Sequence, residues 1–427
     1  MGYGITNDAY YPAIASAIRS KAGTTSTYRP SEMASAIAAI ETGMDPVHAI
    51  LCYVPSGSMS GSMSFVKSNA FAYCSALTTV NMPSCTTVGD GAFQNCTSIT
   101  TVSLPLCTSV GGSAFASCSA LMTVSLPKCT SVGNYAFQNC TSITTVNLPL
   151  CTSVGNSAFQ SCSSLTTASL PACTTVGNSA FQSCFALSSV SLPACTTVGS
   201  SAFQSCSTLA SIDLPACETV GDAAFQNCSA LASVSLPKCT TVGRYAFASC
   251  SLLASVSLPK CTTVSSGAFY SCYSLATVSL PVCTTVGDYA FYSCSRLTTV
   301  NLPSCTSVGG WAFSGCPSLA TVSLPLCTSV GGYAFWNCPS LTTVRLQKCT
   351  VIGTAAFLRD YKFVSLYLTS VSKVTTLLSK DTFNSTPIGG YSASAGRYGS
   401  VYVPASLLNS FKTATNWASI SSRIVAG

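Results

Sequence analysis

The stretch L-M-T-V-S-L-P-K-C-T-S-V-G-N-Y-A-F-Q-N-C, which runs from Leu121 to Cys140, decides the fold because its pattern recurs along most of the chain. Phenylalanine after alanine returns every 22 residues from Phe71 to Phe357, fourteen times in all. Cysteine returns every 11 residues from Cys74 to Cys349, which accounts for 26 of the 27 cysteines. A period in the twenties is typical of solenoids, in which each coil buries its apolar face only against its neighbours.

Each repeat predicts one short strand followed by a turn and a second apolar segment. In the quoted stretch, Val124 and Leu126 are expected to face inward, with hydroxyl residues between them facing out. Pro127 ends the strand, Gly133 is expected to supply a backbone bend, and Phe137 fills the second half of the core. The pattern predicts a β-rich solenoid of 22-residue coils with about 14 stacked parallel strands.

The repeat also resembles a known family. The half L-x-x-V-x-L-x-x-C is a leucine-rich-repeat pattern, and the proline with the half V-G-x-x-A-F-x-x-C resembles the BspA-like leucine-rich repeats, over about residues 65 to 370. This resemblance implies an α/β-type leucine-rich-repeat solenoid. The family more usually has 23 residues per coil, and the shorter coil is expected to alter curvature and not fold.

Composition excludes several classes of protein. Hydrophobic residues make up 48% of the 427 residues and charged residues 7%, which is incompatible with a disordered chain. A net charge of +7 without a Lys/Arg cluster is too dilute for nucleic-acid binding. The sequence shows no apolar run of about 18 residues, so no membrane insertion is expected. The start, Met1 to Lys21, lacks the cationic head and apolar stretch of a secretory signal.

The cysteines permit three interpretations. A disulfide scaffold is disfavoured, because side chains about 4.8 Å apart on stacked coils are too distant for Cβ atoms that must lie nearer about 3.8 Å. A zinc site is disfavoured, because the 11-residue spacing contains no C-x-x-C pair and His48 is the single histidine. The favoured interpretation is a reduced cysteine ladder, two inward columns of small core-filling thiols.

The first 43 residues differ from the repeats. The strings I-A-S-A-I-R-S-K-A-G and T-Y-R-P-S-E-M-A-S-A-I (residues 14–23 and 27–37) have apolar residues at helical spacing. They resemble a helical segment at the start of phage and prophage tail-associated proteins, which implies that residues 1–43 attach the chain to other virion tail proteins; the alternative is a small helical cap. Residues 44–66, with the stretch S-G-S-M-S-G-S-M-S, are interpreted as a linker and the start of an N-terminal cap.

The solenoid is assigned to residues 67–370 and a C-terminal cap to residues 371–427. Ser400 to Pro404 is expected to be a final strand, and Ala405 to Ile424 an amphipathic helix. The string Y-V-P-A-S-L-L-N-S-F-K-T-A-T-N-W (residues 402–417) resembles the closing segment of BspA-like proteins. Its physical role is to cover the open edge of the last coil, whose unpaired backbone groups invite stacking.

Catalytic residues are not expected. Asp213, Glu218 and Asp222 are close in sequence, but nothing else supports a metal or glycosidase pair there. The cysteines are expected to be too deep to act as nucleophiles, and no phosphate-binding glycine motif is present. We therefore expect no enzyme, no catalytic or metal site, and no cofactor.

The remaining candidates are surface columns. Outward Thr and Ser positions such as Thr101 and Ser103 are a flat hydroxyl array; ice binding is a remote interpretation, and ordinary solvated strand positions are favoured. The positions flanking the repeated phenylalanine become aromatic in the later coils. These candidate binding residues either recognise a partner or stack on one another as a ladder, and they are Tyr245, Tyr270, Tyr289, Tyr292, Trp311, Tyr333 and Trp336.

These observations lead to two hypotheses. The first is a non-enzymatic phage or prophage tail fibre or tail-associated protein, located in the virion, whose solenoid binds a host-surface glycan or protein. The alternative is a secreted or cell-surface BspA-like adhesin of a bacterium or protist. A homo-oligomer is compatible with either, and neither requires nucleic acid.

Overall fold

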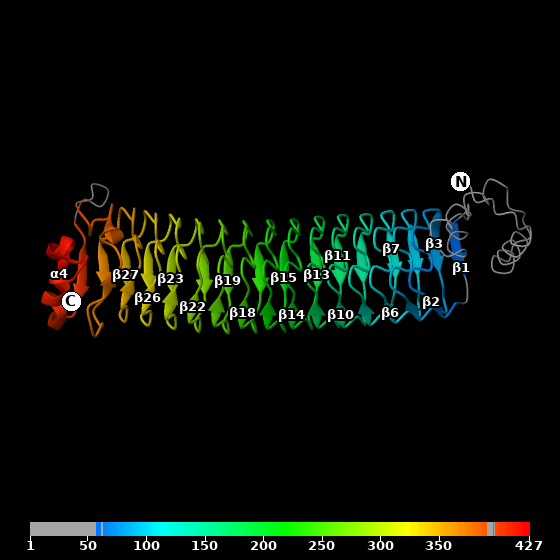
Figure 1. Cartoon of the computed structure of the whole chain (residues 1–427), viewed down its shortest axis with the longest axis horizontal. Coiled ribbons are helices and arrows are strands. Elements are labelled where there is room, and N and C mark those ends of the chain that lie inside the picture. Colours follow the sequence, from blue (N-terminus) through cyan, green and yellow to red (C-terminus); the bar gives the residue numbers. More distant parts are fainter. Residues whose placement is uncertain (1–56, 61–62, 391–395, 397) are drawn as a thin grey trace, which may run out of the picture.

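The computed structural model describes residues 57–60, 63–390, 396 and 398–427, which form one long, nearly straight rod of stacked coils (Figure 1). Fifteen two-residue strands make one continuous parallel sheet along the rod, in the order β2-β4-β6 and so on to β30. Five smaller sheets, with four, three, two, two and six strands, make up the second strand face. The predicted parallel β-solenoid with 22-residue coils is confirmed.

The strands are short and recur once per coil on each face. The continuous sheet contains β2 (Phe65–Val66), β4 (Thr87–Val88), β6 (Ser109–Val110), β8 (Ser131–Val132), β10 (Ser153–Val154), β12 (Thr175–Val176), β14 (Thr197–Val198), β16 (Thr219–Val220), β18 (Thr241–Val242), β20 (Thr263–Val264), β22 (Thr285–Val286), β24 (Ser307–Val308), β26 (Ser329–Val330), β28 (Val351–Ile352) and β30 (Thr376–Leu377). The second face contains β1 (Gly57–Ser60), β3 (Leu77–Asn81), β5 (Thr101–Ser103), β7 (Thr123–Ser125), β9 (Thr145–Asn147), β11 (Thr167–Ser169), β13 (Ser189–Ser191), β15 (Ser211–Asp213), β17 (Ser233–Ser235), β19 (Ser255–Ser257), β21 (Thr277–Ser279), β23 (Thr299–Asn301), β25 (Thr321–Ser323), β27 (Thr343–Arg345), β29 (Ser365–Tyr367), β31 (Ser400–Val403) and β32 (Ile424–Ala426).

A column of phenylalanines runs through the core. From Phe71 to Phe357, rings of successive coils stack with centroids 5.1–5.5 Å apart and planes within 14° of parallel. Phe383 continues the stack at 5.9 Å from Phe357. The 22-residue period therefore places like residues on like residues, so each coil completes the core of the next.

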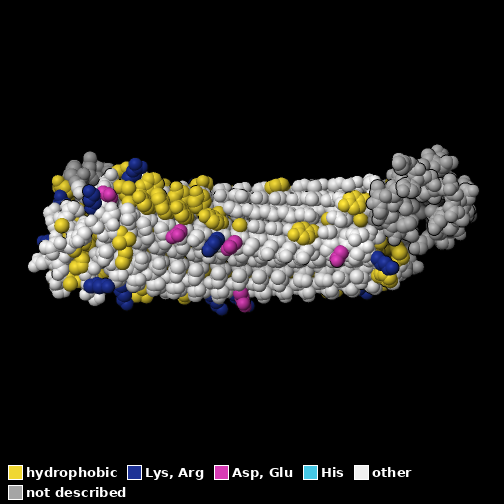
Figure 2. All heavy atoms as spheres, in the orientation of Figure 1, with side chains coloured by type: hydrophobic (Ala, Val, Ile, Leu, Met, Phe, Trp, Pro, Cys, Tyr) yellow, Lys and Arg dark blue, Asp and Glu magenta, His cyan; other side chains and the backbone are white. Residues whose placement is uncertain are grey.

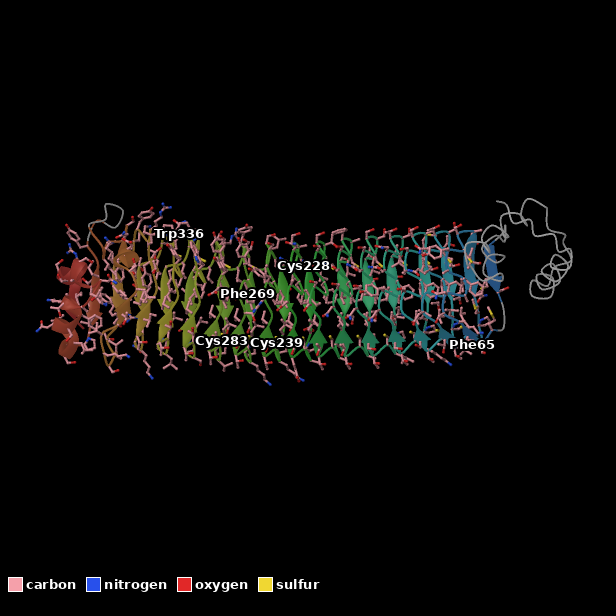
Figure 3. All side chains as sticks on the ribbon, in the orientation of Figure 1. Phe65, Cys228, Cys239, Phe269, Cys283 and Trp336 are labelled. Atoms are coloured by element: carbon pink, nitrogen blue, oxygen red, sulfur yellow. The ribbon has the colours of Figure 1, made fainter. Side chains whose placement is uncertain are left out.

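Two further core columns are thiols, as expected from the 11-residue spacing (Figure 3 labels Cys228 from one column and Cys239 and Cys283 from the other). Twenty-five cysteines, Cys85 to Cys349, are free and buried. In one column the thiol donates to the phenylalanine carbonyl of the preceding coil, as Cys96 does to Phe71 over 2.9 Å. In the other it donates to the carbonyl two residues on. Burial raises the thiol pKa, to about 12 at Cys184, so the thiols stay protonated.

The expectation of reduced cysteines is wrong at one position. Cys74, at the first coil, is disulfide-bonded, and none of the twenty-five free cysteines is its partner. Stacking distance argues only against bridges between equivalent rungs, and Cys74 is the first rung of its column within the described residues. The distance between stacked coils therefore does not exclude a disulfide between Cys74 and a cysteine that is not on an equivalent rung.

The repeated glycine has a different role from the one predicted. Gly133 does not adopt a positive φ; a Cβ there would lie 2.7 Å from backbone atoms of Gly111 and Gly112 in the preceding coil. Glycine is required because two backbones approach closely. The sharp bends are instead made two residues before and after the phenylalanine, by left-handed residues such as Tyr135 (φ 60°) and Asn139 (φ 59°).

At the N-terminal end of the rod, one further strand extends the second strand face. Residues 57–60, within a stretch predicted to be a linker or loop, form β1 and pair in parallel with β3, and Thr78 Oγ1 donates to the Gly57 carbonyl over 3.0 Å. The pairing occupies backbone groups that an open edge strand would expose. The predicted helices and attachment segment in residues 1–43 lie outside the described residues.

The C-terminal cap covers the opposite edge. β31 pairs with β29, and β32 pairs with β31. The single helix predicted from Ala405 to Ile424 is wrong: the segment divides into η2 (Ala405–Leu407), α4 (Leu408–Thr413), η3 (Ala418–Arg423) and β32, and η1 (Lys380–Phe383) precedes it. The helix α4 ends where Ala414 is extended (φ −70°, ψ 151°), and left-handed Asn416 (φ 64°) follows before η3. That break points Trp417 inward, where it is fully buried and donates from Nε1 to the Thr375 carbonyl over 2.6 Å.

Candidate functional site

The seven aromatic residues predicted from the sequence lie together and form one connected set of ring contacts, which we call the aromatic cluster. Figure 2 shows hydrophobic side chains gathered along one edge of the rod near its C-terminal end, and Trp336 is labelled at that edge in Figure 3. The sequence prediction left recognition and mutual stacking as alternatives. The rings do stack, and all seven also keep part of their surface in solvent.

The cluster contains two rows that follow the rod. In the first row, Tyr289, Trp311 and Tyr333 stack nearly parallel, with centroid separations of 6.0 and 4.3 Å. In the second, Tyr270 stacks on Tyr292 at 5.0 Å. Edge and tilted contacts join the rows, at Tyr245–Tyr270, Tyr289–Tyr292 and Trp311–Trp336. The rows therefore form one rigid surface that spans five coils.

The first row is built on strained backbone. Tyr289, Trp311 and Tyr333 all have φ of 57°, and Tyr245 has φ of 53°. Bulky side chains rarely adopt this left-handed conformation, which costs roughly 1 kcal/mol or more per residue. The same column takes glycine at Gly91 and Gly267, so the position does not require a ring for folding. Serine and alanine occupy the same left-handed position in other coils, so the fold does not require aromatic residues there.

Three further residues complete the cluster and were missed from the sequence. Tyr273 is 51% exposed, and it contributes to the raised pKa of Tyr270, after burial and Tyr292. The Arg359 guanidinium lies over the Trp336 ring, 5.6 Å from its centroid. Ser314 lies in the second row between Tyr292 and Trp336. Tyr273 follows a cysteine, outside the two columns that the sequence drew attention to.

Ser314 carries an unusual hydroxyl. It is fully buried, and its Oγ is one of two buried side-chain oxygens without a hydrogen-bond partner among the described residues. Leaving a buried hydroxyl unpaired costs about 1–3 kcal/mol. The two adjacent coils place Tyr292 and Trp336 at this position and earlier coils place Gln or Ala there, so the fold does not require an unpaired hydroxyl inside the aromatic cluster.

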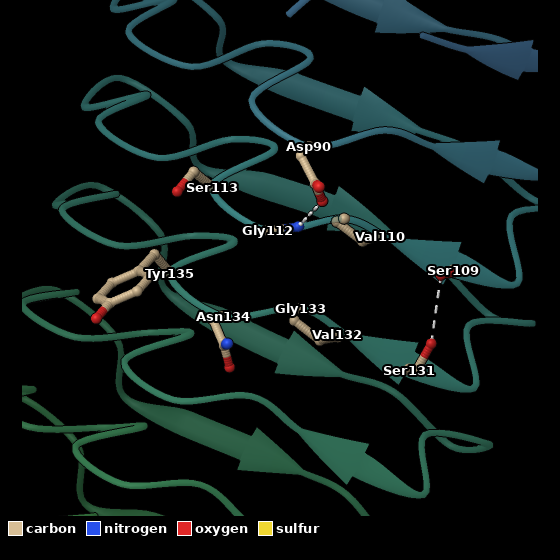
Figure 4. Close-up of a pocket in the computed structure, with 11 residues that line it drawn as sticks. Asp90, Ser109, Val110, Gly112, Ser113, Ser131, Val132, Gly133, Asn134 and Tyr135 are labelled. Atoms are coloured by element: carbon tan, nitrogen blue, oxygen red, sulfur yellow. Dashed lines mark hydrogen bonds between the residues drawn. The ribbon is translucent and has the colours of Figure 1, made fainter. Parts of the chain in front are cut away.

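A shallow pocket of about 630 Å³ lies on the N-terminal half of the rod, along the column three residues before the phenylalanine (Figure 4). It opens at Gly112, which has no side chain and which lies between Asp90 and Asn134 of the adjacent coils. The Gly112 amide donates to Asp90 Oδ1 over 2.6 Å. Tyr135, 45% exposed, borders the pocket.

The acidic residues do not assemble into a site. Asp213 is on β15 and Glu218 lies directly before β16, both exposed, while Asp222 Oδ1 accepts the backbone amide of Arg244 over 2.7 Å. Across residues 57–60, 63–390, 396 and 398–427, no three His, Cys, Asp or Glu side chains converge on a position that would suit a metal ion. In the same part of the chain, none of the helices has the length and apolar character needed to cross a bilayer.

Comparison with known proteins places these features in context. The model of the BspA type leucine-rich repeat region, in six copies, matches residues 64–186, 174–298 and 284–391. No curated protein matches the chain.

Solved structures that share similarity include leucine-rich repeat proteins from three bacteria. One from Bacteroides ovatus is 26% identical with a TM-score of 0.43, covering 63% of this chain and 86% of that one. A leucine rich cell surface protein from Faecalibacterium prausnitzii is 21% identical with a TM-score of 0.38, covering 88% and 90%. The T. pallidum leucine rich repeat protein is 26% identical with a TM-score of 0.30, covering 39% and 78%.

Proposed function

Because this chain belongs to the BspA-type leucine-rich-repeat family, we propose that it is a non-enzymatic recognition protein whose rod binds a host surface through the aromatic cluster. Leucine-rich-repeat proteins generally have structural or binding roles. The rod supplies a stiff support, and hydroxyl residues cover much of its strand faces. Function is therefore concentrated where the surface departs from the repeat.

The observation that carries the proposal is the aromatic cluster itself. Seven rings on consecutive coils occupy columns that elsewhere, apart from Tyr135 and Leu358, hold small or polar residues, and Tyr245 and Tyr289 remain 41% and 37% exposed. Rigid, partly exposed aromatic residues are the commonest energetic anchors of binding surfaces, because they lose little side-chain entropy when a partner covers them.

This binding activity fits two kinds of protein, a virion tail fibre and a secreted or cell-surface adhesin. The N-terminal strings that resemble phage tail-associated proteins favour a virion tail fibre, attached through residues 1–43 to other tail proteins. The family match favours a secreted or cell-surface adhesin of a bacterium or protist. Both place the aromatic cluster against a host-surface glycan or protein, and neither involves a cofactor.

The test is the double substitution Trp311→Ala and Trp336→Ala in the full chain. Binding to host cells, measured by flow cytometry with labelled protein, is expected to weaken at least about tenfold, which corresponds to about 1.4 kcal/mol. The control is Tyr135→Ala. Tyr135 has the same left-handed backbone as Trp311 and is 45% exposed, more than either tryptophan, but it lies outside the cluster.

Thermal unfolding separates recognition from packing. Both tryptophans are half-buried, so a moderate fall in melting temperature is expected alongside the loss of binding. Unchanged cell binding with a large loss of stability would show that the rings only pack, and it would refute the proposal.

A further inference from the structure

A row of backbone amides runs beside the first row of rings. In most coils the residue three before the phenylalanine has a polar side chain, and where it is Asp or Asn its side-chain oxygen accepts the amide of the next coil. Asn134 accepts from Asn156 over 2.8 Å, and Asp288 accepts from Gly310 over 2.7 Å. These bonds tie the coils together along this edge.

Within the described residues the row is interrupted in several coils, and two of the interruptions lie beside the aromatic cluster. Gly310 and Gly332 have no side chain, so the amides of Gly332 and Thr354 have no acceptor within the described part of the chain. The nearest atoms to a Cβ placed at either glycine would be 3.3–3.4 Å away, and Thr354 and Asp288 are exposed. We call Asp288, Gly310, Gly332 and Thr354 the polar strip.

The polar strip and the first row of rings lie side by side, because they are formed by adjacent residues of the same coils. Tyr289, Trp311 and Tyr333 each directly follow a member of the strip. The strip therefore offers an exposed carboxylate acceptor and, at Asp288, Gly332 and Thr354, three amide donors without an acceptor among the described residues, at the border of a stacked aromatic surface. The unpartnered hydroxyl of Ser314 is a second, independent unsatisfied group within the cluster.

We propose that the polar strip and the rings of Trp311 and Tyr333 form a binding site for a neutral carbohydrate. This inference rests on the proposed recognition function and names its ligand class. Sugar hydroxyls donate to the Asp288 carboxylate and accept from the amides of Gly332 and Thr354, while the apolar C–H surface of the sugar packs against the rings. Few precisely placed polar groups beside an aromatic surface are typical of small-ligand sites.

The charges favour a neutral ligand. Asp288 is the one charged member of the strip, and it would repel a uronic or sialic acid. The nearest cation of the cluster, Arg359, is stacked over Trp336. A folded protein partner would have to place a polar group opposite each of these amides, whereas a sugar carries such groups around its whole rim.

The test uses Gly310→Asn, which restores the interrupted row. The new side chain can accept the Gly332 amide as Asn134 accepts that of Asn156, and it covers the strip without removing a ring. The matched control is Gly112→Asn, where a Cβ meets the same surroundings beside Asp90 and Asn134 in the N-terminal half. Both variants are expected to keep or raise the melting temperature, because each gains a hydrogen bond between coils.

The probes are immobilised mannan, β-1,3-glucan and galactan, with hyaluronan as the acidic comparison, and full-length protein as the analyte. We expect one of the neutral polysaccharides to bind, Gly310→Asn to weaken that binding at least about tenfold, and Gly112→Asn to leave it within about twofold. Asp288→Asn, which can keep the bond to the Gly310 amide while removing the carboxylate, is a second variant and is expected to weaken binding in the same direction.

The outcomes separate the two proposals. Cell binding that depends on Trp311 without binding to any neutral polysaccharide overturns the carbohydrate site and leaves the recognition function standing. Full carbohydrate binding by both Gly310→Asn and Asp288→Asn, or preference for hyaluronan, also overturns the site. Absence of binding to cells and polysaccharides alike overturns both.

Discussion

Asp360 makes the stability of the C-terminal end dependent on pH. It occupies the rung where the cysteine column would continue after Cys338, and it is fully buried. Its Oδ1 accepts the Cys338 amide over 2.7 Å, and its Oδ2 has no partner. Burial raises the pKa of this carboxyl well above the usual value of 3.8. The cysteine side chains in this column instead donate a hydrogen bond to a phenylalanine carbonyl. An ionised carboxylate has no proton and cannot form that bond.

The direction of the effect follows from proton linkage. Because the pKa is higher in the folded state, the folded protein holds more protons than the unfolded chain above about pH 4, and stability falls as pH rises toward the folded pKa. While the folded carboxyl stays protonated the slope approaches about 1.4 kcal/mol per pH unit, so wild-type protein is expected to lose stability through this group as the pH rises from 5 toward the folded pKa. The other titratable group that faces Asp360 is Cys338, whose own raised pKa keeps it neutral throughout.

Asp360→Asn removes the titration while it preserves the acceptor for Cys338. Urea unfolding of both proteins at pH 5, 6 and 7, followed by intrinsic tryptophan fluorescence, isolates the effect, because Trp417 lies in the adjacent cap and all other titrations cancel in the difference. The variant is expected to gain stability relative to wild type as pH rises. Parallel pH profiles for the two proteins would contradict a neutral buried carboxyl at this rung.

Two further predictions concern the core. Phe203 lies in the middle of the phenylalanine column, with a ring 5.3 Å away on each side. Phe203→Ala is expected to lower the unfolding free energy by about 3–5 kcal/mol in denaturant titration, whereas Phe185→Ala, at a residue that is 50% exposed, is expected to lower it much less. Similar losses for the two variants would mean that the column is not the main core. The buried thiols are expected to resist iodoacetamide at pH 8 in folded protein and to react after denaturation. At a pKa of about 12, only about one Cys184 thiol in 10⁴ is ionised even before access is considered, and mass spectrometry showing extensive labelling of folded protein would contradict this.

The core of the fold could be predicted because it is periodic. Each inward residue of one coil is the neighbour of its own copy 22 residues later, so a one-dimensional repeat specifies the phenylalanine and thiol columns without further information. The proximity of the aromatic residues could be predicted for the same reason. Residues in equivalent positions of adjacent coils must be neighbours, as the stacking of Trp311 on Tyr333 demonstrates.

The repeat does not specify the backbone conformation within a coil, and it does not specify the structure at the two ends of the rod. The repeat alone does not reveal that the Trp311 position is left-handed, because serine, alanine and tyrosine occupy it as well as glycine. The pairing of β1, the disulfide at Cys74 and the break before Trp417 all lie where periodic neighbours are missing on one side. Asp360 was missed because it stands one rung beyond the last cysteine of its column.

The division between periodic and irregular positions explains how such a rod can vary its recognition surface. The left-handed column lies two residues from the buried phenylalanine, so its side chains change without altering the core stack. Gly267 shows that the column is nevertheless organised: a Cβ there would collide with the ring of Tyr245. The missing side chain lets that ring lie across the next coil, toward Tyr270, and so joins Tyr245 to the aromatic cluster. A glycine in the row of rings is therefore part of the surface, because it sets the position of the ring before it.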